Sequence, residues 1–176
     1  VNTDLSVVAI ADKAFAGIEE LVSVTLPADL DYIDDDELIY NFMGGSAFAD
    51  CPLLETVDLG ALPVISNFAF ENCISLANIN WDSVVSVGAN AFANCDSIVS
   101  ATNLPKGVIS VGQSAFANCD SLTEADIDAP IIENSVFEGC AQLKEVSLGD
   151  SNPTIVGGLD NHYIGDKVVA NCPSLE

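Results

Sequence analysis

Positive charge is almost missing from the sequence. It has no arginine, and its only lysines are Lys13, Lys106, Lys144 and Lys167. Its 27 acidic residues give a formal net charge of −23 at pH 7. Because phosphate binding needs clustered lysine or arginine, nucleic acid is not expected as a partner. Anionic membrane surfaces are disfavoured for the same reason, whereas a basic macromolecule or a metal ion suits this charge.

Long apolar runs are missing as well. No stretch reaches the roughly 18 residues of a membrane helix, so no membrane insertion is predicted. The first residues, from Val1 to Asp4, lack the features of a signal peptide. Hydrophobic residues still make up 49% of the chain, which indicates a folded protein rather than a disordered acidic one. The length of 176 residues predicts one domain over 1–176.

One motif repeats along the whole chain. An Ala-Phe pair recurs with phenylalanine at 15, 48, 70, 92 and 116, and degenerate pairs end at Phe137 and Val169. Three residues after the pair stands Ile18 in the first copy and a cysteine in the others, and an aliphatic residue lies five before the aromatic position. Successive copies are 22, 22, 24 and 21 residues apart in the middle and 33 and 32 at the ends. The long intervals predict insertions near 29–41 and 149–163.

The repeat predicts an α/β solenoid of about seven turns of ~22 residues. Pairs such as Val57 with Leu59 and Val146 with Leu148 alternate with polar residues, which is typical of a half-buried strand. We therefore expect short parallel strands on one face. The Ala-Phe-x-x-Cys segment is too short for a full helix and predicts one helical turn per repeat on the opposite face.

The pattern Ile-Gly-x-x-Ala-Phe-x-x-Cys-x-x-Leu-x-x-Val-x-Leu resembles the BspA-like (Treponema pallidum type) leucine-rich repeats. Its best copy runs from Val87 to Ile98, and the resemblance covers nearly the whole chain apart from the two insertions. It implies a right-handed superhelix in a secreted or surface-exposed protein that serves adhesion and not catalysis. Departures are Trp81 at a leucine position and an extra residue near Leu104. Because the last repeat stops before its strand, we expect a natural protein that continues, or a trimmed chain.

The residues that could carry chemistry have structural explanations. All six cysteines share one repeat position, which favours buried free thiols over disulfides or a metal site. The phenylalanines are expected to stack in the core. His162, the only histidine, lies in the second insertion without an identifiable orienting partner. We therefore predict no catalytic site and no cofactor.

The first insertion carries a calcium candidate. Its carboxylates are those of Asp29, Asp31, Asp34, Asp35 and Asp36. Calcium takes oxygen ligands in loops, but the glycine of an EF-hand is absent here. The alternative is a solvated acidic loop.

A partner is expected on the outward side of the strands, on a concave face. The polar residues predicted there are Thr56, Asp58, Asn78, Asn80, Asp82, Thr102, Glu124, Asp126, Asp128 and Glu145. This strip suits a basic protein segment, or a glycan with a bound cation, and Trp81 is the one large aromatic residue beside it. The leading hypothesis is a surface or secreted interaction module. The alternative is a passive stalk or spacer.

Overall fold

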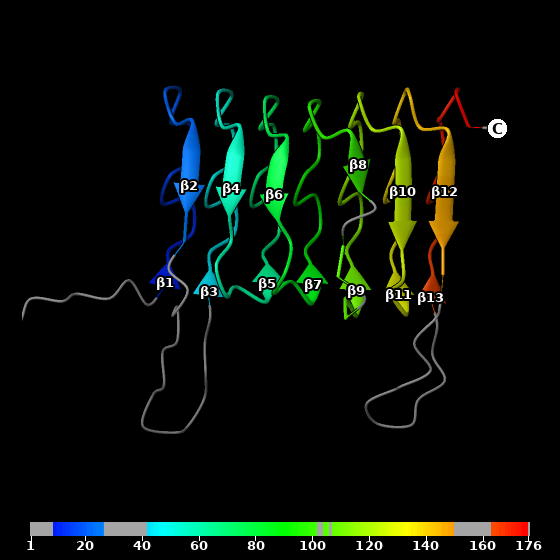
Figure 1. Ribbon diagram of the computed structural model, residues 1–176, viewed down its shortest axis with the longest axis horizontal. Coiled ribbons are helices and arrows are strands. Elements are labelled where there is room, and N and C mark those ends of the chain that lie inside the picture. The colour runs from blue at the N-terminus through cyan, green and yellow to red at the C-terminus, as the bar shows by residue number, and fades with distance from the viewer. Residues whose placement is uncertain (1–8, 27–41, 102–103, 106, 150–162, 176) are drawn as a thin grey trace, which may run out of the picture.

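The computed structural model describes residues 9–26, 42–101, 104–105, 107–149 and 163–175. All regular elements in these ranges are short strands, and each strand pair is parallel. Figure 1 shows them in two rows, as expected for a chain that winds repeatedly around one axis. The protein is therefore a parallel β-solenoid.

The longer strands form the first row. They are β2 (Ser23–Thr25), β4 (Thr56–Asp58), β6 (Asn78–Asn80), β8 (Ser100–Ala101), β10 (Glu124–Ile127) and β12 (Glu145–Leu148). Their hydrogen bonds divide the row into two sheets, β2-β4-β6 and β8-β10-β12. This is the strand face that the alternation of polar and apolar residues predicted.

The second row consists of two-residue strands. They are β1 (Ala9–Ile10), β3 (Phe42–Met43), β5 (Val64–Ile65), β7 (Ser86–Val87), β9 (Ser110–Val111), β11 (Ile131–Ile132) and β13 (Tyr163–Ile164). β1 pairs with β3, and the other five form one sheet. The aliphatic residue that recurs five positions before the aromatic one belongs to these strands, which the sequence did not predict.

The core is a stack of identical positions. Six phenylalanine rings follow one another with centroids 5.1–5.7 Å apart and planes within 18° of parallel. The other five are buried, whereas Phe15 at the start of the stack is 42% exposed. Such stacking buries a large apolar area and adds offset ring contacts. The predicted structural role of the phenylalanines is confirmed.

The predicted helical turns are wrong, because the described residues contain no helix. In each turn, the residues two before and two after the aromatic position adopt positive φ, for example 53° at Asn90 and 61° at Asn94. The left-handed conformation interrupts a right-handed helix, so the segment folds as successive tight turns. Asparagine, serine and glycine hold most of these positions because they tolerate this geometry.

Backbone hydrogen bonds between turns replace those of a helix. The amide of Phe92 donates to the carbonyl oxygen of Ala115 in the next turn at 2.8 Å, and the amide of Asn94 donates to Ala117 at 2.9 Å. The same bonds recur from turn to turn, always from an amide to the carbonyl of the following turn. Backbone hydrogen bonds thus join neighbouring turns on this wall as well as between the paired strands. The fold class is a β-solenoid rather than the expected α/β solenoid.

The expected count of about seven repeats is also not supported. The longest sheet in the described part of the chain has five strands. The copy that ends at Val169 lacks the phenylalanine of the stack, and Glu176 lies outside the described residues.

Candidate binding surface

The strand face holds most of the residues predicted to contact a partner. Thr56 and Asp58 lie on β4, Asn78 and Asn80 on β6, and Asp82 just beyond β6. All are exposed except Asp58, which is half-buried. Their neighbours Val57 and Leu59 are buried, because successive side chains of a strand point to opposite sides.

The other described members lie at the far end of the face. Glu124 and Asp126 on β10 and Glu145 on β12 are exposed, and Asp128 is half-buried. Thr102 lies outside the described residues, as do the calcium candidates Asp29, Asp31, Asp34, Asp35 and Asp36 and the histidine at position 162. Their predicted roles therefore stay predictions.

A hydrogen-bonded group joins β4 to β6. The Asn80 side-chain amide donates to the Asp58 carboxylate at 3.1 Å, and that carboxylate also accepts from the Gly60 backbone amide at 3.0 Å. The Asn80 side-chain oxygen in turn accepts from the Asp82 backbone amide at 3.0 Å. These bonds fix the orientation of Asp58 and Asn80, so this half of the face presents a preset polar surface.

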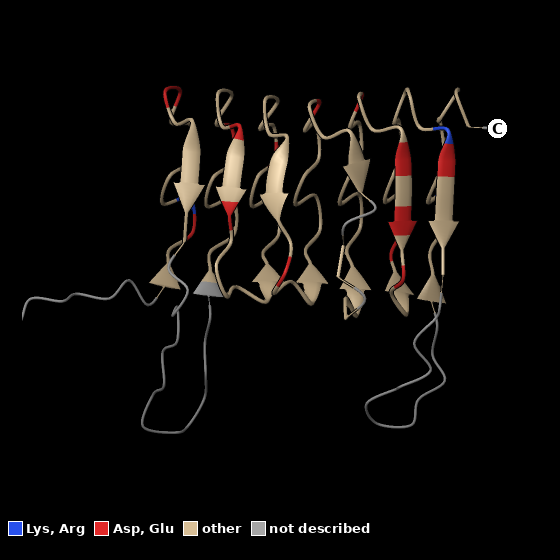
Figure 2. Ribbon diagram, viewed as in Figure 1, with Lys and Arg blue, Asp and Glu red and all other residues tan. Residues whose placement is uncertain are grey.

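Negative charge is concentrated on β10 and β12 (Figure 2). Glu124 lies directly beside Glu145 in the register of these parallel strands, and Asp126 lies beside Ser147. Like charges on neighbouring strands repel one another, so this arrangement lowers stability unless a cation lies nearby. The pair therefore provides an electrostatic reason to bind positive charge.

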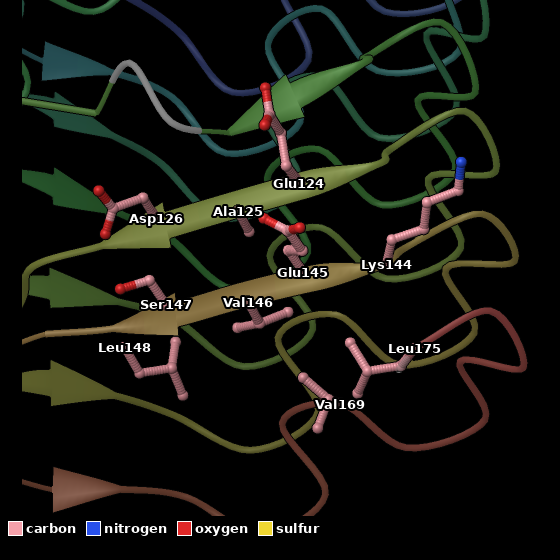
Figure 3. Close-up of a pocket in the computed structure, with 10 residues that line it drawn as sticks. All are labelled: Glu124, Ala125, Asp126, Lys144, Glu145, Val146, Ser147, Leu148, Val169 and Leu175. Carbon is pink, nitrogen blue, oxygen red and sulfur yellow. The ribbon is translucent and has the colours of Figure 1, made fainter.

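A shallow groove runs along the outer edge of β12. Figure 3 shows Glu124, Asp126 and Glu145 on its acidic side, with Lys144 near the start of the strand. Val146 and Leu148 line its apolar side together with two residues of the last described turn, Val169 and Leu175. Among the described residues, no group of three or more histidine, cysteine or acidic side chains is arranged to hold a metal ion.

Trp81 is a core residue and not an exposed anchor of the strip. Its indole is 7% exposed and lies edge-on to Phe92, with ring centroids 5.1 Å apart. It also reaches Phe116, at 6.2 Å. A second groove lies on the strand face and is lined by residues of β4 and β6, by Ser100 and by Trp81 itself. The repeat pattern identified Trp81 as a departure but did not predict that its side chain turns inward.

The six cysteines are free. Each thiol donates a hydrogen bond to the carbonyl oxygen of the phenylalanine in the preceding turn, at 3.1–3.2 Å. Burial raises the pKa of the Cys73 and Cys140 thiols to about 12, and that of Cys95 and Cys119 well above the ordinary value. Because thiolate is the reactive form, these side chains are suited to packing rather than to nucleophilic chemistry. The prediction of buried free thiols is confirmed for five cysteines, whereas Cys172 is half-buried.

A ladder of side-chain amides follows the opposite wall. Asn72 donates to Asp50 at 2.7 Å, Asn94 to Asn72 at 2.7 Å, and Asn118 to Asn94 at 3.0 Å. All three asparagines have the left-handed conformation, with φ of 61° at Asn72 and Asn94 and 55° at Asn118. Their side-chain amides therefore satisfy one another along this wall.

Comparison with known proteins agrees with the repeat. The family model of the BspA type leucine-rich repeat region matches residues 1–41 and 41–176 of this chain, in six copies. A search of curated proteins found no match. No helix in the described part of the chain is long and apolar enough to cross a membrane.

Two solved structures share the fold. The leucine-rich repeat protein of T. pallidum is 27% identical with a TM-score of 0.72, and the match covers 96% of this chain and 72% of that one. A leucine-rich cell surface protein of Faecalibacterium prausnitzii is 24% identical with a TM-score of 0.65, over 96% of this chain and 41% of that one. With its stacked turns and the family match over nearly all of its length, this chain belongs to the BspA-type leucine-rich repeat family.

Proposed function

We propose that this protein is a non-catalytic interaction module, located at the cell surface or secreted, which binds a macromolecular partner through its strand face. The observation that carries the proposal is the side-by-side placement of Glu124 and Glu145 on an exposed parallel sheet. A basic partner would relieve their repulsion, which gives the face an electrostatic reason to associate. The surface location rests on the family and on the likeness to the cell surface protein of F. prausnitzii.

The partner is a protein segment or a glycan that presents positive charge or a bound cation. Among the described residues of the strand face no aromatic side chain is exposed, so each contact is expected to be weak. Repetition of the module on a surface would raise the overall affinity through avidity. Adhesion to neighbouring cells or matrix fits such many-copy binding.

Charge reversal on the strand face tests the proposal. A variant with Asp58→Lys, Glu124→Lys, Asp126→Lys and Glu145→Lys would be compared with the natural sequence in pull-downs from extracellular-matrix and cell-surface extracts. We expect at least a tenfold loss of the recovered partner, with the circular dichroism spectrum unchanged.

The matched control reverses four exposed acidic residues outside the strands. It carries Glu19→Lys, Glu20→Lys, Asp120→Lys and Asp166→Lys, so its net charge equals that of the first variant. Equal loss in both variants would indicate attraction to overall charge and not to the strand face. A partner indifferent to both variants, or no partner at all, would favour the alternative function, a passive stalk or spacer.

A further inference from the structure

The strand face is interrupted between β6 and β8. These strands come from successive turns, yet each ends a separate sheet. No Cα atom of β6 lies within 8 Å of a Cα atom of β8, whereas paired neighbours in a sheet lie about 4.8 Å apart. The second row is continuous at the same place, because β5, β7 and β9 are paired in order. The interruption therefore belongs to the strand face alone. Figure 1 shows β8 closer to β10 than to β6.

Trp81 explains the interruption. The preceding turn has Leu59 at its repeat position, and Ile127 holds that position two turns ahead. Its larger indole extends beneath the next turn to Phe92 and onward to Phe116, so it occupies core volume that belongs to those turns. On β8 the inward residue is the small and buried Ala101. The indole thus forms an apolar floor below the space between the two sheets.

The β6 edge of this space offers backbone hydrogen bonds. The Asn78 amide donates to the Glu55 carbonyl oxygen on the β4 side at 3.1 Å. In a parallel ladder alternate residues direct their amide and carbonyl toward opposite neighbours, so those of Ile79 face the interruption. An unpaired strand edge is a template for another extended chain.

Negative charge on both sides of this space favours a basic segment. Asp58 on β4 and Asp82 beyond β6 lie on one side, and Glu124 and Asp126 lie on β10 beyond β8 on the other. No lysine occurs within β4, β6, β8 or β10. An entering strand places alternate side chains on opposite faces, so basic residues would point outward to the carboxylates while β-branched residues rest on the indole.

We propose that an extended basic segment of a partner polypeptide inserts between β6 and β8, over Trp81, and completes the strand face as an additional strand. This inference rests on the proposed function, because it specifies how the same face holds its partner. The partner is a polypeptide, and a partner that proves to be a glycan would contradict the insertion.

The only tryptophan of the chain reports on the site directly. A capped peptide of alternating lysine and valine would be titrated into the full protein while tryptophan emission and the hydrogen-exchange rate of the Ile79 amide are followed. We expect a saturable emission shift and at least a tenfold slowing of Ile79 exchange. An unchanged Ile79 amide in the saturated complex would overturn the insertion.

Two modified peptides separate insertion from plain charge attraction. One has the same sequence with N-methyl groups on alternate amides, which removes the hydrogen bonds of one edge but keeps all charge. The other replaces lysine with glutamate. We expect both to bind at least tenfold more weakly than the parent peptide, and equal binding by the N-methylated peptide would contradict strand insertion.

Substitution of Trp81 tests the floor. Trp81→Leu restores the residue type that Leu59 has in the preceding turn and is expected to weaken peptide binding at least tenfold. If this variant does not fold, peptide binding is measured with Trp81→Phe instead, and Ile79 amide exchange in the natural chain decides whether the peptide inserts. Partner capture that depends on the strand-face carboxylates but is indifferent to Trp81→Leu, with no peptide insertion, would overturn this inference and leave the proposed function standing.

Discussion

The Cys95 thiol donates a hydrogen bond of 3.1 Å to the carbonyl oxygen of Phe70 in the preceding turn. That carbonyl also accepts the backbone amide of Cys73 at 3.2 Å, so one oxygen joins a turn to itself and to its successor. Cysteine suits this position because it is small, apolar and still a donor. The bond recurs at every cysteine of the chain and adds side-chain links to the backbone ladder.

We expect Cys95→Ala to lower the free energy of unfolding by about 1–3 kcal/mol, through the lost hydrogen bond and the small cavity left behind. Urea denaturation followed by circular dichroism measures this change. Cys172→Ala is the control, because its thiol makes the same bond at a half-buried site in the last described turn. A loss at Cys172 as large as at Cys95 would show that burial contributes little.

Stability should fall at high pH through the buried thiols. Cys73 has an ordinary pKa of 9.0 when unfolded and one of about 12 when folded, because burial penalises the thiolate. A group that binds its proton more tightly in the folded state contributes stability that is present below the unfolded pKa and lost as pH rises toward the folded one. Between pH 9 and 12 the loss is about 1.4 kcal/mol per pH unit for this thiol.

Urea denaturation at pH 8, 9.5 and 10.5 tests this dependence. Cys73→Ala should be less stable at pH 8 but should show a shallower decline, since one titrating group is gone. Identical slopes for the two proteins would refute the assignment of the decline to Cys73.

The phenylalanine stack should be most sensitive in its middle. Phe92 is fully buried between two parallel rings, and we expect Phe92→Ala to cost about 3–5 kcal/mol. Phe15 has a ring neighbour on one side and is 42% exposed, so Phe15→Ala should cost less than half as much. Thermal unfolding of both variants measures the difference, and equal costs would mean that stacking on the second side adds nothing.

The left-handed turn at Asn94 distinguishes backbone from side-chain effects. Its φ of 61° suits glycine, and its amide bonds to Asn72 and Asn118. Asn94→Gly loses those hydrogen bonds, but glycine adopts positive φ without strain. Asn94→Ala loses the same hydrogen bonds and also strains the backbone, because alanine disfavours positive φ. We therefore expect the alanine variant to be less stable than the glycine variant by about 1 kcal/mol in thermal or urea unfolding. The reverse order would show that the turn does not require this geometry.

Local periodicity accounts for the features that the sequence predicted correctly. The recurring phenylalanine and cysteine positions indicated which side chains lie in the core, because stacked copies bury equivalent residues against one another. The alternation around Val57 and Val146 predicted the strand face in the same way. The outward carboxylates followed from that alternation, whereas their function as a binding site stays a proposal.

The sequence by itself thus determined the repeat register, the composition of the core and the outward polar strip. The tertiary structure decided the rest. The helical turns are absent because left-handed residues such as Asn90 and Asn94 direct their amides to the next turn, and such partners lie about 22 residues away rather than four. The interruption of the strand face depends on one indole that reaches Phe116, two turns ahead. Contacts of that range are made by packing between turns, and the pattern within a single repeat does not contain them.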